Sequence, residues 1–157
     1  MITIATSRFD NDTILENISY RELHPNIKCI YGTPTPLGAK IEYRSLVYVI
    51  EMNNSENKVI GIGLIRNAPS CPYLIRPYQN MNFNRYVFTG DYRINRDEIP
   101  VDLLNILEKL LFYGKTHMKR GCGITTLSSK IMRHHTLCEI DIYSELYNAF
   151  RNKYQNA

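Results

Sequence analysis

Residues 45–52 of this chain read SLVYVIEM, and residues 58–65 read KVIGIGLI. Both segments are rich in β-branched and aromatic residues, and the polar run NNSEN lies between them at 53–57. Two strand-forming segments joined by a short turn of this kind predict an antiparallel hairpin. Gly61 and Gly63 fall on one face of the second strand, where glycine often marks a bend or the close approach of another backbone.

The segment before the hairpin predicts one strand and one helix. Residues 2–6 alternate apolar and polar side chains, which is typical of a strand. Residues 10–12 read DND and can cap a helix whose apolar residues share one face. Pro25 ends this helix because proline disfavours helical geometry in the residue before it. Residues 28–38 hold a short apolar run and then a loop rich in proline and glycine.

The segment after the hairpin changes from strand to helix. Residues 68–84 are rich in proline and asparagine and predict an irregular stretch, and two short strands are expected at 85–88 and 91–94. Five leucines between 103 and 111 form one helical stripe after Pro100. Gly114 can follow the end of that helix as its C′ residue.

The last part of the chain predicts a short strand and further helices. Residues 124–127 are strand-like, and Ser128 can cap a short helix. The final helix carries an aromatic and apolar stripe that ends at Tyr154, and the tail from about 152 is expected to fray. The sequence therefore predicts one α+β domain over 1–157, with a mostly antiparallel, barrel-like sheet and flanking helices.

Composition and charge fit an ordinary globular domain. The 157 residues carry a formal net charge of +4, which is compatible with a polyanionic partner. The four cysteines show neither C-x-x-C nor zinc-finger spacing, which indicates reduced thiols. No segment resembles a signal peptide or a membrane span, so we expect an intracellular protein of the cytoplasm or nucleus with no membrane partner. Abundant tyrosine, asparagine and isoleucine without tryptophan are typical of an AT-rich genome. If the source is viral, the host cell or the virion is the expected location.

Familiar catalytic and cofactor motifs are absent from the sequence. The GIG at 61–63 lacks the third glycine of a dinucleotide fingerprint. His134 and His135 are adjacent and do not have the spacing of a helical zinc pair. Asp10, Asp12 and Glu16 are not followed by a calcium-loop pattern, and helix capping accounts for them. We therefore expect no cofactor, no metal and no catalytic residue.

A basic, glycine-bearing loop is the strongest candidate site. Basic side chains beside exposed backbone amides favour an anion site, and the alternative is a solvated loop whose glycines serve only the turn. Tyrosines on or beside the sheet could stack bases, or could instead belong to the core and the ordinary sheet surface. The candidate loop residues are Lys115, His117, Lys119, Arg120, Gly121, Gly123 and Thr125.

Four segments together resemble the PUA-like superfamily, within it the EVE, ASCH and YTH group. They are residues 30–32, 45–52, 58–65 and 120–127, and the resemblance covers about two-thirds of the chain. It implies a barrel-like module that holds a flipped or single-stranded, often modified, base. The chain lacks the tryptophans of many such pockets, so tyrosine or phenylalanine would form the cage, and 68–84 is an insertion.

The leading hypothesis is a module that binds RNA or DNA or reads a modified base. Lys115, Lys119 and Arg120 would contact phosphates. The residues expected at the base pocket, either stacking on the base or bonding its edge, are Tyr31, Gly32, Thr33, Asn67 and Tyr86, with Thr125 from the loop.

Two other classes of protein are also compatible with the sequence. One is a structural or interaction protein, for example a viral assembly component, that uses its aromatic surfaces as interfaces. The other is a small ASCH-like amidohydrolase acting on modified nucleosides, which would bring Lys115 close to Glu51. The hydrolase would need a lysine with a nearby carboxylate, and a binding module is favoured over an enzyme.

Overall fold

The computed structural model describes residues 2–155, and its elements follow the predicted order. The strands are β1 (Thr3–Phe9), β2 (Cys29–Thr33), β3 (Leu46–Asn53), β4 (Lys58–Arg66), β5 (Tyr86–Gly90), β6 (Tyr92–Asn95) and β7 (Ile124–Thr126). The helices are α1 (Asn11–Leu23), α2 (Val101–Phe112), α3 (Ser129–Met132), α4 (His135–Cys138) and α5 (Ile142–Gln155), with 3-10 turns η1 (Met81–Asn84) and η2 (Arg96–Glu98).

The predicted hairpin is confirmed as the centre of a five-stranded sheet. β3 and β4 pair antiparallel from Leu46–Arg66 to Asn53–Lys58, with an irregularity between Glu51 and Met52. The sheet order is β6-β4-β3-β1-β7, in which β1 runs parallel to β3 and antiparallel to β7. The fold is therefore α+β with a mostly antiparallel sheet and helices on its flanks, as predicted.

The expected barrel-like closure is not found. The five-stranded sheet is open, since β6 and the three-residue β7 stand at its two edges. β2 and β5 pair only with each other, as a separate antiparallel ribbon. β1 lies between β3 and β7, so the strands of the sheet do not follow one another as a continuous meander.

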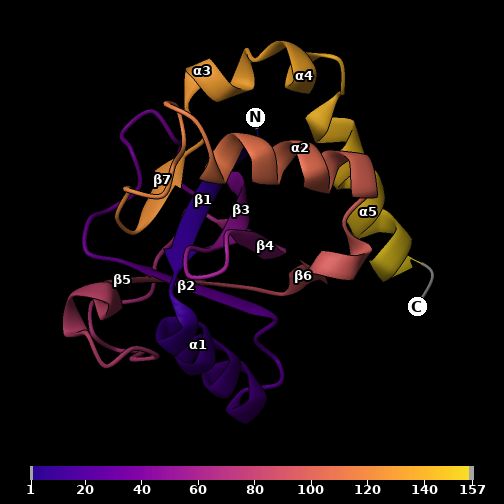
Figure 1. Cartoon of the computed structure of the whole chain (residues 1–157). Helices are drawn as coiled ribbons and strands as arrows, with labels where there is room; N and C mark the ends of the chain where they lie inside the picture. The colour runs from indigo at the N-terminus through magenta and orange to yellow at the C-terminus, as the bar shows by residue number, and fades with distance from the viewer. Residues whose placement is uncertain (1, 156–157) are drawn as a thin grey trace.

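Each face of the sheet buries its own core. Successive side chains of β3 alternate between the faces, as strand geometry requires. Tyr48, Ile50 and Met52 join the leucine stripe of α2 and the buried side of α5 in one cluster. Val47 and Val49 join the ribbon and Ile14 of α1 in the other cluster. Figure 1 shows this division, with α2, α3 and α4 on one side of the strands and α1 on the other.

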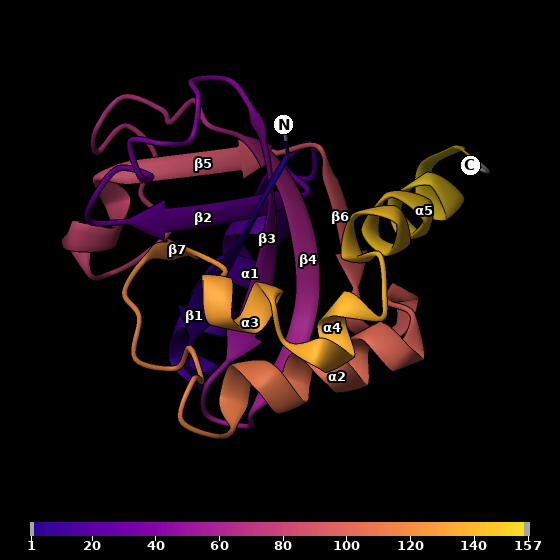
Figure 2. The ribbon, with the colours of Figure 1, turned by 90° about the horizontal axis from the view of Figure 1, so that it is seen from above.

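Glycines let the β2-β5 ribbon lie directly on β4. Figure 2 shows the ribbon running across the direction of β3 and β4. A Cβ at Gly63 would lie 2.1 Å from the Tyr31 hydroxyl, and one at Gly90 would lie 2.2 Å from the Leu64 carbonyl oxygen. Gly63 of β4 is therefore a site where another strand approaches closely, as the sequence pattern indicated.

The predicted N-cap of α1 and the predicted helices α2 and α5 are confirmed. Asp10 caps α1, with its carboxylate accepting from the Thr13 amide at 2.8 Å. All five leucines of the α2 stripe are buried. The tail that was expected to fray from about 152 is helical to Gln155, and 156–157 lie outside the described residues.

Two further expectations concern the cysteines and the membrane. All four cysteines are free, and Cys29 alone among them is buried. Burial, and then the nearby Glu51 carboxylate, raise the pKa of the Cys29 thiol to about 12. Within residues 2–155, no helix combines the length and the apolarity that crossing a membrane requires.

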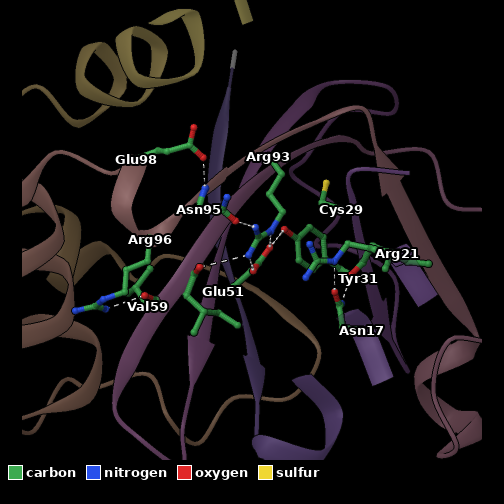
Figure 3. Close-up of polar contacts among 12 residues, drawn as sticks. Asn17, Arg21, Cys29, Tyr31, Glu51, Val59, Arg93, Asn95, Arg96 and Glu98 are labelled. Carbon is green, nitrogen blue, oxygen red and sulfur yellow. Dashed lines mark hydrogen bonds and ion pairs between the residues drawn. The ribbon is translucent and has the colours of Figure 1, made fainter. Parts of the chain in front are cut away.

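A buried ion pair joins the strands beneath the ribbon (Figure 3). Arg93 of β6 donates to both carboxylate oxygens of Glu51, at 2.9 and 2.7 Å, and Tyr31 donates to the same carboxylate at 2.5 Å. The Arg93 and Glu51 side chains are 10% and 3% exposed. Burial by itself would lower the pKa of Arg93, but the Glu51 carboxylate raises it above the usual value for arginine. Glu51 thus connects β3, β6 and the ribbon.

Changing Glu51 to Gln should destabilise the protein strongly. The substitution keeps the shape but leaves the Arg93 charge buried without its counter-charge, which typically costs ~3–5 kcal/mol. Glu98→Gln, in the half-exposed pair with Lys153, should cost only ~0–1 kcal/mol. Urea unfolding measures both free energies, and equal small losses would show that the buried pair does not hold the sheet and ribbon together.

Candidate functional site

A cavity of about 340 Å³ opens where β1 ends and α1 begins. Its walls come from the β1–α1 junction, from β2, from the end of β3, from the segment around η1 and from the loop before β7. The lining residues are Ser7, Arg8, Phe9, Asp10, Thr13, Glu16, Gly32, Asn54, Tyr78, Asn80, Phe83 and Gly123. A volume of this size is typical of small-molecule sites, which lie in the range ~300–1,000 Å³.

The last residues of β1 form part of this lining. Phe9 is buried in the same cluster as Ala5, and strand alternation puts Ser7 on that face of β1. Ser7 is 3% exposed and lines the cavity, yet its hydroxyl makes no hydrogen bond with any residue in 2–155. Buried hydroxyls normally have a partner, so Ser7 presents a free polar group to whatever fills the cavity.

Arg8 fastens the loop that was predicted as the binding loop. All five N–H groups of its guanidinium are used. Nε donates to the Gly121 carbonyl at 2.7 Å, and Nη2 donates to the Gly123 carbonyl at 2.7 Å and to Thr125 Oγ1 at 2.8 Å. Nη1 donates to Thr6 Oγ1 at 2.8 Å and to the Met118 carbonyl at 3.4 Å.

The charge of Arg8 has no carboxylate partner. None of the three ion pairs within residues 2–155 includes Arg8. Burial lowers the pKa of its guanidinium, and neighbouring Cys122 acts in the opposite direction. Because the acceptors of Arg8 are all neutral, the base of the loop retains a positive charge.

Contacts within the protein explain the two loop glycines. A Cβ at Gly121 would lie 2.6 Å from the Arg8 guanidinium carbon. Gly123 has φ +67°, and a Cβ there would lie 2.1 Å from Thr33 Oγ1. The loop therefore turns its carbonyl groups toward Arg8.

The opposite wall comes from residues 78–84, inside the stretch that the sequence marked as an irregular insertion. Asn84 is fully buried and closes this segment on itself, because its side-chain amide bonds the Tyr78 carbonyl at 2.6 Å and the Tyr78 amide at 3.1 Å. Asn17 of α1 donates to the Tyr78 hydroxyl at 2.9 Å. Gly32 allows the wall to close, since a Cβ there would lie 1.9 Å from the Phe83 carbonyl oxygen. Phe83 and Tyr78 thus become fixed aromatic residues of the cavity.

Two of the predicted loop residues, Gly123 and Lys119, adjoin the cavity. Gly123 lines the cavity, and Asn54, which also lines it, donates to the Lys119 carbonyl at 2.9 Å. Lys119 is half-buried, whereas Lys115 and Arg120 are exposed. None of these three basic side chains takes part in an ion pair with residues 2–155.

His117 and Thr125 have roles within the protein. The Lys119 amide donates to His117 Nδ1 at 3.2 Å, which shapes the turn of the loop. Thr125 accepts from Arg8 through its hydroxyl, and its carbonyl accepts from Thr6 at 3.3 Å. The hydroxyl of Thr125 already has a partner and is not among the groups that line the cavity.

The predicted base-pocket residues do not converge as expected. Gly32 lines the cavity, and Thr33 is buried against Gly123. Tyr31 is 0% exposed and donates to Glu51, so its ring has no free face for a base. Asn67 donates to the Ile41 carbonyl at 3.0 Å, and Tyr86 packs beside Arg85, both away from the lining.

Several cavity residues were missed at the level of sequence. Ser7, Phe9, Asn54 and Phe83 carry no recognisable motif, and the pattern gave no reason to prefer them. One available signal was the helix cap at Asp10, because a capped helix that directly follows a strand marks a junction where a site can form. The cavity offers aromatic rings, hydroxyl and amide groups and carboxylates, a set suited to binding a planar polar ligand.

The geometry does not supply the predicted hydrolase pair or a metal centre. The Glu51 carboxylate is buried against Arg93, whereas Lys115 is exposed in the loop after α2. No hydrogen bond or ion pair links Lys115 to Glu51. Over the described part of the chain, no three His, Cys, Asp or Glu side chains are grouped to hold a metal ion.

Comparison with known proteins gives no relative: no protein-family model, no curated protein and no solved structure matches the chain.

Replacing Gly123 by Ala should disrupt the loop more than the same change at Gly114. Both glycines have positive φ, +67° and +82°, a conformation that costs an alanine ~1–2 kcal/mol. Only the Cβ at Gly123 meets a neighbour, Thr33, and such overpacking adds ~1–3 kcal/mol. Thermal unfolding measures the difference, and equal effects of the two substitutions would contradict the close contact between the loop and β2.

Proposed function

We propose that this protein binds single-stranded or locally unpaired nucleic acid and accommodates one base in the cavity at the β1–α1 junction. The observation that carries the proposal is the combination of an aromatic, polar cavity with an adjoining loop whose basic side chains form no ion pair within residues 2–155. Asn54 connects the two, since it lines the cavity and bonds the Lys119 carbonyl. Sequence-specific recognition of unpaired nucleic acid commonly stacks a splayed base on aromatic rings while basic groups contact the phosphates.

The positions of the aromatic and basic groups support this division of roles. Phe83 is half-buried and Tyr78 is 7% exposed, so both can contact a ring in the cavity. Lys115 and Arg120 are exposed, and Lys119 is half-exposed, so their charges are accessible to phosphates outside it. A formal net charge of +4 also favours a polyanion.

The proposal also includes the family of the protein and its location in the cell. We propose a PUA-like module whose sheet remains open and whose cage uses phenylalanine and tyrosine, with a modified base among its ligands. Four free cysteines are consistent with a reducing, intracellular compartment.

A second candidate, an interaction protein, is favoured by exposed aromatics on α5. Tyr143 and Tyr147 are 43% and 54% exposed and are one helical turn apart, while Leu146 and Phe150 on the same helix are buried. Light scattering distinguishes the candidates: a stable oligomer that dissociates on Tyr147→Ser and has no nucleic-acid affinity would favour this second function.

Changing both Lys119 and Arg120 to Ala should reduce the salt dependence of binding. For a single strand, the log–log slope of affinity against salt falls by roughly 0.7 for each phosphate that the protein no longer neutralises. Lys109→Ala with Arg151→Ala removes the same charge from exposed positions on α2 and α5 and should leave the slope nearly unchanged. Fluorescence anisotropy with labelled oligonucleotides measures the slopes. Failure of the unaltered protein to bind any single-stranded DNA or RNA at low salt rejects the proposal.

Changing Phe83 to Ala should weaken binding without changing the salt slope. Loss of one base-stacking side chain typically costs ~1–3 kcal/mol, or about 5- to 150-fold in affinity. Tyr86→Ala is the matched control, since Tyr86 is also half-buried but does not line the cavity. The same anisotropy titration compares the two variants, and a larger loss with Tyr86→Ala would move the base to another surface.

A further inference from the structure

The two carboxylates that line the cavity each keep one oxygen without a partner in residues 2–155, and so does the amide of Asn54. Asn54 Oδ1 is buried without a hydrogen-bond partner, although Nδ2 of the same amide is bonded to Lys119. Asp10 uses Oδ1 in the cap of α1, at 2.8 Å from the Thr13 amide, and its Oδ2 accepts from no residue in 2–155. Glu16 accepts from the Gln79 amide through Oε2 alone. Asn54 Oδ1 is enclosed by the protein, whereas Asp10 is exposed and Glu16 is half-buried, so two carboxylate oxygens of the lining remain open to a ligand.

The principal cation of the cavity is not available to a ligand. Every N–H of the Arg8 guanidinium already has an acceptor within the protein. The Ser7 hydroxyl is free and more than nine-tenths buried, and it can donate or accept. The side-chain donors that remain, the Ser7 hydroxyl and Asn80 Nδ2, are neutral, whereas the free acceptors open to a ligand belong to carboxylates.

The carboxylates also determine which part of a nucleotide can enter. The backbone amide of Thr13 holds the pKa of Asp10 below its usual value. At neutral pH this side chain is therefore ionised and can accept hydrogen bonds but not donate them. A phosphate in the cavity would meet the like charges of Asp10 and Glu16 and would find no free donor on Arg8, whereas the Lys119 charge beside the cavity is not paired within residues 2–155. A base therefore enters with its phosphates outside.

We infer that the cavity selects a base with an exocyclic amino group, and that the free carboxylate oxygen of Asp10 accepts a hydrogen bond from that group. This inference rests on the proposed function. Guanine, adenine and cytosine carry such an amino group, whereas thymine and uracil carry a carbonyl acceptor in its place. A carbonyl facing Asp10 would place one acceptor against another, and the hydrogen bond between the amino group and the charged carboxylate would be lost.

The test uses single-stranded pentamers TTXTT in which only the central base changes. X is guanine or hypoxanthine, which differ by the amino group alone, and cytosine or thymine. Isothermal titration calorimetry of the unaltered protein should give guanine over hypoxanthine, and cytosine over thymine, by about tenfold or more in affinity. The same pentamers as RNA, with uracil for thymine, should give the same order.

Two matched variants assign the preference to a side chain. Asp10→Asn keeps a good helix cap but replaces one free acceptor by a donor, so the guanine-to-hypoxanthine ratio should fall toward one. Asp12→Asn removes the same charge two residues along, from an exposed position that does not line the cavity, and should keep the ratio.

The outcomes separate this inference from the function on which it rests. Equal affinities for all central bases, with binding still weakened by Phe83→Ala, would overturn the amino-group preference and leave the base cavity in place. No binding by any pentamer would overturn both. An unchanged ratio in Asp10→Asn would remove Asp10 from the contact.

Discussion

The candidate site depends on the hydrogen bonds that the Arg8 side chain donates to the loop before β7. This side chain reaches from the end of β1 to four residues between Met118 and Thr125 and saturates its donors there. A guanidinium can do this because its five donors have a fixed planar arrangement that neutral carbonyls can match one by one. A lysine could bond at most three of these acceptors. Arg8 therefore holds the basic loop against the β1–α1 junction and gives the cavity its wall.

The central hairpin and the long helices could be predicted because their signals are local. The β3–β4 hairpin has a strand pattern on both sides of a short polar turn, and the five leucines of α2 lie on one stripe. The position of β1 could not be predicted in this way. Its pairing of Thr3 with Val47 and of Ala5 with Thr126 joins residues distant in the chain, and nothing within residues 3–9 specifies those partners. The open sheet and the separate ribbon follow from such pairings.

The candidate site was only partly predictable for a related reason. The composition of the loop identified a basic segment with glycines, but the reason for the glycines lies in Arg8 and Thr33, which are far away in sequence. Tyr31 and Phe83 are both aromatic residues beside a glycine or asparagine, and only the fold decides which is buried. Tyr31 is fixed under the ribbon by Glu51, whereas Phe83 is held at the cavity by the closed loop of Asn84.

The most direct measurement is an NMR titration of the ¹⁵N-labelled protein with a single-stranded pentanucleotide. If a base occupies the cavity, the largest amide shift changes should map to the cavity and its surroundings, at residues 7–13, 80–84 and 119–123 together with Asn54. Shifts confined to α5 around Tyr143 and Tyr147, or changes at Asn67 and Tyr86 without changes at residues 7–13, would contradict this placement of the base.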